Sequence, residues 1–296
     1  MMNDSPETHS ALLLTTQLGM VDRQLYPAPF STQQWWGLCQ RLRQQGLDAS
    51  VLLDHPERNQ RFLGSADVER ILRLKSGRKL SDAIHALALD GIWLLGQTDA
   101  GYPACFRALG RHAPPVIYGV GALSLLGEDK RRLSIVGTRS AGQVALRYAQ
   151  QLATSAAQAD IVVVSGGAMG VDSQAHSAAL NAGGGSVFVL PCGLLARQAR
   201  QWLERITGNY VMISQVPPHT VASAATALAR NRFIYSLGEE TVVVSAHYQK
   251  GGSWKGAVDA LEKNARIFVR DADEKGLQGL LERGAFRLKQ ASVAEL

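Results

Sequence analysis

Residues 161–172 read IVVVSGGAMGVD, an apolar β-branched run that ends in a glycine-rich turn. A stretch of helical composition, residues 171–182, follows the turn. An apolar strand that leads through glycines into a helix is typical of a parallel sheet with both faces covered by helices. This stretch therefore predicts an α/β fold in which the glycines lie at the carboxyl edge of the sheet.

The same alternation of strand and helix continues on both sides of this stretch. Further strands are predicted at 133–137, 186–190, 210–214, 241–245 and 266–269, and helices at 143–157, 195–206, 222–237 and 256–264. Right-handed crossovers between such strands give a Rossmann-like, doubly wound, mostly parallel sheet. Ligands of these sheets bind at the carboxyl ends of the strands, near the point where the strand order reverses.

Residues 1–90 have a different pattern. Ser31–Gln45 and Ser65–Leu74 each open with a serine that can cap a helix, and Asp82–Leu89 continues in the same style. These short amphipathic segments predict a small all-helical domain, of degenerate helix-hairpin or SAM-like type, over residues 1–90. The Rossmann-like domain is then expected over 91–290. Trp35 and Trp36 are interpreted as core residues of the small domain, whose function the sequence does not predict.

Charge is unevenly distributed along the chain. Residues 1–100 carry 10 Lys and Arg against 11 Asp and Glu, whereas residues 101–296 carry 21 against 14. A basic second half favours a polyanionic partner held by that half. The three widely spaced cysteines form neither a zinc pattern nor a disulfide framework, and no apolar run is long enough to span a membrane. We therefore expect a cytoplasmic protein without membrane association.

Glycine-rich turns follow two of the predicted strands, at 137–140 (GTRS) and 165–170 (SGGAMG). Glycines allow tight turns and close approach of the backbone, and free amides at the start of a helix bind anions. Arg139 adds a planar cation suited to phosphate. The second turn matches neither GxGxxG nor a P-loop, which disfavours NAD binding and P-loop ATP chemistry. Both turns predict phosphate binding.

Two polar residues open the helix after the second turn. Asp172 is placed to interact favourably with the helix dipole. His176 lacks a serine or cysteine nucleophile as partner, so we expect a structural or phosphate-facing histidine instead of a general base. No catalytic residue is assigned.

Two more basic segments come later in the chain. Arg230-Asn231-Arg232 lies between two predicted strands, and both of its guanidinium groups are expected to face the cleft. Lys250 precedes Gly251–Ser253, which predicts a second anion-binding helix start, with Lys255 nearby. Trp254 is interpreted as a core residue in preference to a base-stacking surface.

In this order and spacing, these segments resemble the DprA/Smf DNA-processing family over about residues 91–286. Ile135–Arg139 is similar to its G-[ST]-R signature, and Ser165–Asp172 with Ala175-His176 to its SGxAxGID..AH signature. Leu190–Leu194 resembles its next strand end, Arg230–Arg232 its RNR motif and Gly251–Ser253 its SGS element. The resemblance implies a pocket that holds single-stranded DNA by its phosphates, a homodimer built through the Rossmann domain, a RecA-type recombinase as partner, and no catalysed reaction.

The predicted phosphate-binding set combines both lines of reasoning, without a cofactor or a metal. It consists of Gly137, Thr138, Arg139, Ser140, Ser165, Gly166, Gly167, Gly170, Asp172, His176, Gly193, Arg230, Asn231, Arg232, Lys250, Gly251, Gly252 and Ser253. The chain also departs from the family pattern. Gln215 and Ser245 stand where acidic residues are usual, and Ala227-Leu228 replaces a Phe-Pro pair, so an aromatic suited to base stacking is missing.

Two alternatives remain open. The same cleft could sense a small nucleotide or hydrolyse one as a nucleotide phosphoribohydrolase, and a scaffold with a vestigial cleft is a third interpretation. Hydrolysis calls for a carboxylate near the ribose, whereas Asp259 and Glu262 lie well along the last predicted helix. The favoured prediction is sequence-independent binding of single-stranded DNA in DNA processing and recombination.

Overall fold

The computed structural model describes residues 5–296. The chain divides into two compact units, one ending at Gly119 and the other spanning Val120–Leu296. The helices predicted for residues 1–90 end at Leu89, and residues 91–119 belong to the same unit as these helices. The domain boundaries at 90 and 290, which were drawn on composition, stay predictions.

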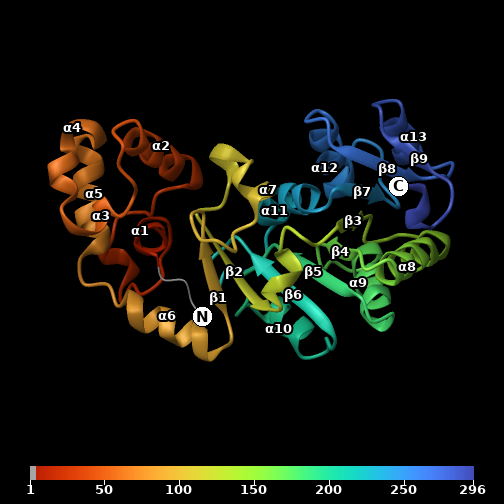
Figure 1. The fold of residues 1–296 in the computed structure, drawn as a ribbon, viewed down its shortest axis with the longest axis horizontal. Coiled ribbons are helices and arrows are strands. Elements are labelled where there is room, and N and C mark those ends of the chain that lie inside the picture. The colour runs from red at the N-terminus through yellow and green to blue at the C-terminus, as the bar shows by residue number, and fades with distance from the viewer. Residues whose placement is uncertain (1–4) are drawn as a thin grey trace. The chain divides into compact units, whose positions relative to one another are not determined.

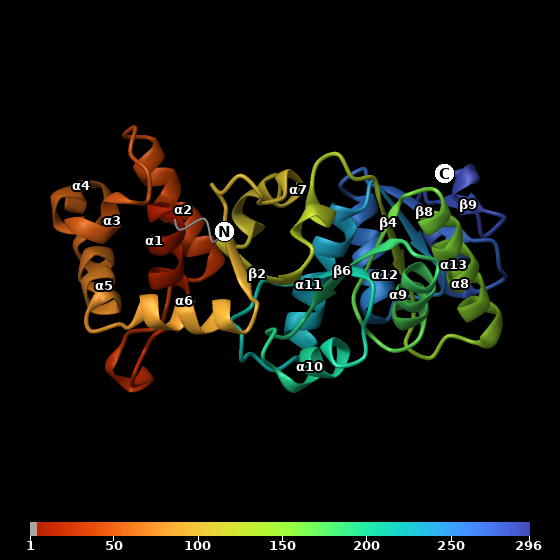
Figure 2. The ribbon, with the colours of Figure 1, turned by 60° about the horizontal axis from the view of Figure 1, so that its bottom comes forward.

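The first unit is mainly helical (Figures 1 and 2). Its helices are α1 Pro6–Thr15, α2 Thr32–Arg43, α3 Val51–Asp54, α4 Gln60–Leu63, α5 Ser65–Lys75, α6 Leu80–Leu89 and α7 Ala104–Arg107, with the antiparallel strands β1 Trp93–Gly96 and β2 Val116–Gly121. Helix α1, which the sequence analysis missed, contacts α2, α3 and α5 and buries Leu12 and Leu14. Trp35 is 4% exposed, which confirms it as a core residue, whereas Trp36 is only partly buried.

The second unit is a parallel sheet flanked by helices (Figure 1). Its strands are β3 Arg132–Val136, β4 Val162–Ser165, β5 Gly185–Leu190, β6 Asn209–Ser214, β7 Glu240–Val243, β8 Arg266–Arg270 and β9 Phe286–Leu288, in the spatial order β6-β5-β4-β3-β7-β8-β9. Its helices are α8 Gln143–Gln158, α9 Val171–Asn181, α10 Arg197–Leu203, α11 Ala224–Leu237, α12 Gly251–Leu261 and α13 Lys275–Leu281. The predicted Rossmann-like α/β fold is confirmed.

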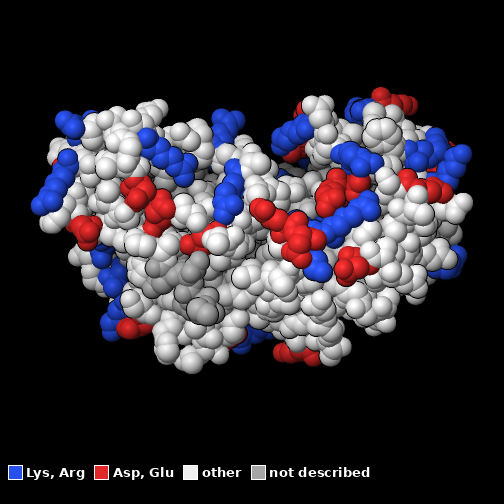
Figure 3. Space-filling model, in the orientation of Figure 1, with Lys and Arg blue, Asp and Glu red and all other residues white. Residues whose placement is uncertain are grey.

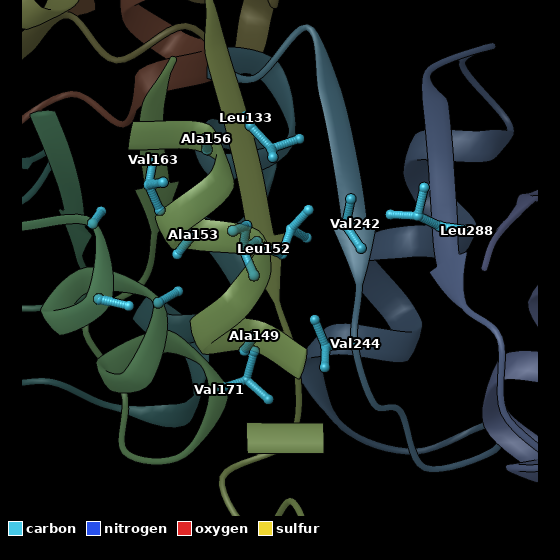
Figure 4. Packing of buried hydrophobic residues seen from close by; sticks show 14 of the residues in the cluster. Leu133, Ala149, Leu152, Ala153, Ala156, Val163, Val171, Val242, Val244 and Leu288 are labelled. Carbon is cyan, nitrogen blue, oxygen red and sulfur yellow. The ribbon is translucent and has the colours of Figure 1, made fainter. Parts of the chain in front are cut away.

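Small residues let the helices lie close to this sheet. In Figure 4, Ala149, Ala153 and Ala156 of α8 face a layer of strand residues that includes Val163 and Val242. All five side chains are fully buried. Because the strands carry apolar residues on both faces, helices must cover both, which is why a continuous apolar run was a reliable strand signal here.

The strand order reverses between β3 and β7. From β3 the chain proceeds through β4 and β5 to β6 on one side, and from β7 through β8 to β9 on the other. The two strands pair in parallel, with Val136 opposite Val243, so their carboxyl ends emerge together. This is the topological switch point at which such sheets bind ligands. Among residues 5–296, no helix combines the length and apolar character that crossing a membrane requires.

Candidate phosphate-binding site

A cavity of about 500 Å³ opens at the switch point. The residues that line it come from the end of β3 and the turn after it, Ala168 in the turn after β4, the first turn of α9, the helix α11, His247 after β7 and the start of α12. Eleven of the predicted residues are among them: Gly137, Thr138, Arg139, Ser140, Asp172, Arg230, Asn231, Lys250, Gly251, Gly252 and Ser253. Segments that are far apart in the sequence therefore share one hollow.

Cations dominate the charge of this cavity. Arg139, Lys250 and Lys255 are exposed and form no ion pair within residues 5–296, and Arg230 lies at the buried base. Among the described lining residues, Asp172 is the only carboxylate. Figure 3 shows Lys and Arg interspersed with Asp and Glu over one face of the molecule. It is the convergence of unpaired cations that sets the cavity apart from that surface.

The turn after β3 is fixed by side chains that follow the neighbouring strand β7. Thr138 Oγ1 lies 3.4 Å from Ser245 Oγ, which in turn donates to Glu274 Oε2 at 2.9 Å. The Glu274 carboxylate also pairs with the Arg270 guanidinium. A carboxylate thus reaches the end of β7 from the segment before α13, although Ser245 itself is uncharged. Since Thr138 lines the cavity, this chain of contacts positions one wall of it.

The start of α12 forms a second wall. The helix begins at Gly251, five residues earlier than predicted. Lys250 is its N-cap residue, and among the described residues no side-chain hydrogen bond caps the helix there. The amides of its first residues have no acceptor inside the helix, and the helix dipole places partial positive charge there. Asn231 Nδ2 donates to the Gly252 carbonyl at 3.1 Å and so ties this start to α11. The predicted second anion-binding helix start therefore opens into the cavity.

The turn after β4 requires a correction. The amides of Gly166 and Ala168 donate to Asp172 Oδ2 at 3.2 and 3.4 Å, so the cradle predicted for phosphate already holds a carboxylate of the protein. Ser165 is fully buried and donates to the Ile135 carbonyl. A Cβ at Gly166 would lie 1.7 Å from Arg230 Nη1, so this glycine admits the guanidinium.

Three further predicted glycines also serve packing. Gly170 has a φ of +84°, and a Cβ there would lie 2.6 Å from the Thr138 carbonyl oxygen. The Gly167 carbonyl accepts from Trp202 Nε1 at 3.0 Å. A Cβ at Gly193 would lie 2.1 Å from the Pro217 carbonyl oxygen. None of the three is among the lining residues within the described chain.

Of the two roles predicted for His176, the structural one is confirmed and its place in the phosphate-binding set is corrected, because the residue is fully buried. Its Nδ1 lies 2.7 Å from Ser186 Oγ, and its ring stacks on Phe188 with the centroids 3.5 Å apart. Burial, with a smaller contribution from the charge of Arg230, lowers the pKa of His176 to about 3. The imidazole is therefore a neutral core group.

The two arginines of the RNR segment have different environments. Arg230 is 5% exposed, and its Nη1 donates to the Val189 carbonyl at 2.6 Å. Burial lowers the pKa of Arg230 and raises that of Asp172, while the opposite charge of each opposes the shift of the other. Arg232 is absent from the described lining. Two residues apart on a helix are about 200° apart around its axis, so the expectation that both face the cleft was wrong.

Several lining residues were not in the predicted phosphate-binding set, although Ala227 and Leu228 had been noted as a departure from the family pattern. The helix α11 contributes Ala224, Ala227 and Leu228, at the spacing of one helical face, because a capping box at Ser223 starts the helix ahead of them. That spacing was the available signal. His247 also lines the cavity, whereas Trp254 is 5% exposed and is confirmed as core.

This fold and cavity define a Rossmann-like protein with an anion-binding pocket at its switch point. The family model described as DNA recombination-mediator protein A matches residues 93–294. The chain belongs to that family, which confirms the resemblance to DprA/Smf proteins. The DNA processing protein DprA of Mycobacterium tuberculosis is 32% identical over 181 residues, 59% of this chain and 46% of that relative. The chain thus spans about half the length of this curated relative.

Two solved structures resemble the chain. DprA from Streptococcus pneumoniae matches with a TM-score of 0.67 and 20% identity, over 88% of this chain and 96% of that one, and so shares its fold. DNA processing protein A from Helicobacter pylori matches with a TM-score of 0.59 and 26% identity, over 68% of this chain and 92% of that one. The latter structure concerns the single-stranded DNA binding mode of that protein.

Proposed function

We propose that this chain binds single-stranded DNA independently of sequence, in the cavity at the switch point, and acts in DNA processing as a recombination mediator. The observation that carries the proposal is the convergence of Arg139, Arg230, Lys250 and Lys255 on one cavity. The single-stranded DNA binding of the Helicobacter pylori relative supports the same ligand.

The contacts would be made to the DNA backbone. Phosphates would lie against the free amides at the start of α12 and along the turn 137–140, with Arg139 and Lys250 supplying charge. Contacts to phosphate fix the position of a strand but carry no base information. Binding through them is therefore expected to be independent of sequence.

The lack of an accessible aromatic ring on the α11 wall of the cavity supports a largely electrostatic mode of binding. Ala227 lines the cavity at the position where the family resemblance implies an aromatic residue. Tyr235 also lines it, but this ring is 8% exposed and its hydroxyl donates to the Ser253 carbonyl, so it is not free to stack on a base. Such stacking contributes about 1–3 kcal/mol per base where it occurs. Without it, the affinity should depend mainly on neutralised phosphates and should fall steeply as salt rises.

The test compares labelled oligo-dT with a duplex of equal length by fluorescence anisotropy over a salt series. We expect tighter binding of the single strand and a slope of about 0.7 in log affinity per log salt for each phosphate neutralised. Equal affinity for the duplex, or an affinity that salt does not change, would contradict the proposal.

The partners belong to the same proposal. We expect a homodimer built through the second unit, a RecA-type recombinase as partner and a cytoplasmic site of action. Sedimentation equilibrium tests the dimer. The rate at which a RecA-type recombinase coats protein-bound oligo-dT tests the partnership, and no acceleration over naked DNA would exclude it.

A small-nucleotide ligand is the second candidate, because a cavity of about 500 Å³ is within the range of small-molecule sites. Hydrolysis is less well supported. Asp259 pairs with Lys263 at 2.7 Å on the exposed side of α12, and Asp172 is buried and already bonded to backbone amides. Incubation with AMP distinguishes nucleotide binding from nucleotide hydrolysis, since release of adenine would favour hydrolysis.

A further inference from the structure

Side-chain contacts join the two segments that follow β3 and β7. Val136 lies opposite Val243 in the parallel register. Two residues further, Thr138 Oγ1 lies 3.4 Å from Ser245 Oγ, and two residues beyond that, Ser140 Oγ lies 3.5 Å from His247 Nε2. Each pair is two residues further along both segments, so the two pairs keep the strand register although Arg139 and Ser140 already lie in a turn. We call Thr138–Ser245 the inner rung and Ser140–His247 the outer rung; Thr138, Ser140 and His247 line the cavity.

The two rungs differ in burial and in support. Thr138 and Ser245 are 8% and 7% exposed, and Ser245 is held by Glu274. Ser140 and His247 are both exposed, and their contact is at the upper limit of a hydrogen bond. The inner rung is therefore structural, whereas the outer rung can open at little cost to stability.

We propose that the outer rung is a phosphate seat, in which a DNA phosphate comes between the two side chains and accepts hydrogen bonds from the Ser140 hydroxyl and the His247 imidazolium. This inference rests on the proposed function and deepens it. A neutral imidazole can donate from one nitrogen only, whereas an imidazolium donates from both and adds a charge. Because a phosphate favours the doubly protonated ring, DNA binding through this seat should be coupled to the uptake of a proton.

The charged groups around His247 explain why a bound phosphate is needed to stabilise a positive imidazole there. Arg139 lies on the turn after β3, Lys250 and Lys255 at the start of α12, and Arg230 on α11. Asp172 is the one described carboxylate in the lining, and it is bonded to the amides of the β4–α9 turn. Glu274 reaches the end of β7 two residues before His247, but it is bonded to Ser245 and paired with Arg270. A positive imidazole at His247 is therefore offset chiefly by the anion of the ligand.

The experiment measures the affinity of the full chain for labelled oligo-dT between about pH 8 and about pH 5.5 at constant ionic strength. We expect affinity to rise roughly tenfold as the pH falls, the size of one charge-assisted contact. The salt slope should steepen by about 0.7 over the same range, since one more phosphate is neutralised.

Three variants make the assignment specific. His247→Gln should bind weakly at every pH, and His247→Lys should bind tightly at every pH. His219→Gln, at an exposed histidine of the same unit that is not among the lining residues, should keep the parent response. A parental pH response in His247→Gln, or a flat response in a parent that binds DNA, overturns the inference alone. No binding of oligo-dT at any pH overturns the proposed function.

Discussion

The turn after β4 and the turn after β3 look alike in sequence but have opposite roles. Both follow an apolar parallel strand and lead through glycine into a helix. In the first, the amides of Gly166 and Ala168 are bonded to Asp172. In the second, Arg139 and Ser140 are exposed and line the cavity together with the start of α12. One turn is closed on itself, and the other is open to a ligand.

The first turns of the helices explain this difference. Helix α9 carries Asp172 in its first turn, whereas α8 and α12 carry no acidic residue there within the described structure. Free amides at a helix start attract an anion, and a carboxylate in the first turn can supply it. A glycine-rich turn thus indicates close approach of the backbone, and the residues after it indicate whether the protein or a ligand fills the space.

The largest expected effect follows from removing the Asp172 carboxylate, the anion that closes the turn after β4. Asp172→Ala leaves two amides without their acceptor and the buried Arg230 charge without its counterpart. We expect the free energy of unfolding to fall by roughly 3–5 kcal/mol, as for other buried charges that lose a partner. Urea unfolding measures it.

The matched control is Asp271→Ala, at an exposed carboxylate that pairs with Arg287. Surface pairs contribute about 0–1 kcal/mol, so its unfolding midpoint should stay close to that of the parent. If Asp172→Ala were as stable as this control, the turn after β4 would not be closed by Asp172, and the contrast with the turn after β3 would fail.

The helix that follows the closed turn should also make stability depend on pH, through the buried His176. Its folded pKa of about 3 lies below the ordinary value, so the unfolded state binds the additional proton between about pH 6.5 and 3. This contribution to stability is complete above about pH 6.5 and is lost as the pH falls towards 3. At about pH 4.5 the loss should be about 2–3 kcal/mol.

Unfolding of the parent and of His176→Asn across this range tests the assignment. The variant should be less stable at neutral pH, because it loses the stacking on Phe188, but its stability should fall less steeply on acidification. His219→Asn, at an exposed site, should follow the parent. Equal slopes in His176→Asn and the parent would show that His176 is not the group that titrates.

The predictable parts of the molecule are those fixed by local pattern. Strands such as β4 were located because each is apolar throughout, whereas β9, three residues long with Phe286 55% exposed, has no such signal. The shared cavity could be foreseen because parallel strand ends meet at one edge. The role of Gly166 in admitting a buried side chain could not be foreseen, since it depends on the Arg230 side chain reaching across from α11.

In the open turn after β3, we expect a substitution of Arg139 to have an intermediate effect, and on DNA binding alone. Arg139 is exposed and makes no ion pair among the described residues, so Arg139→Ala should leave stability unchanged. Affinity for oligo-dT should fall about tenfold at low salt, evenly across base sequences, and the salt slope should drop by about 0.7. Arg147→Ala, at an exposed cation of α8 that is not a lining residue, is the control. Unchanged affinity in Arg139→Ala would remove the open turn from the site.

The smallest effect is expected at the second arginine of the RNR segment. Arg232 follows Arg230 by two positions on α11, which turns it about 200° away from the base of the cavity, and it is not among the described lining residues. Arg232→Ala should therefore change affinity for oligo-dT by less than about threefold, as expected for a cation that acts only through the general field. If it weakened binding as much as Arg139→Ala, the strand would have to leave the cavity around the far side of α11, and the open surface would extend beyond the two helix starts that define it here.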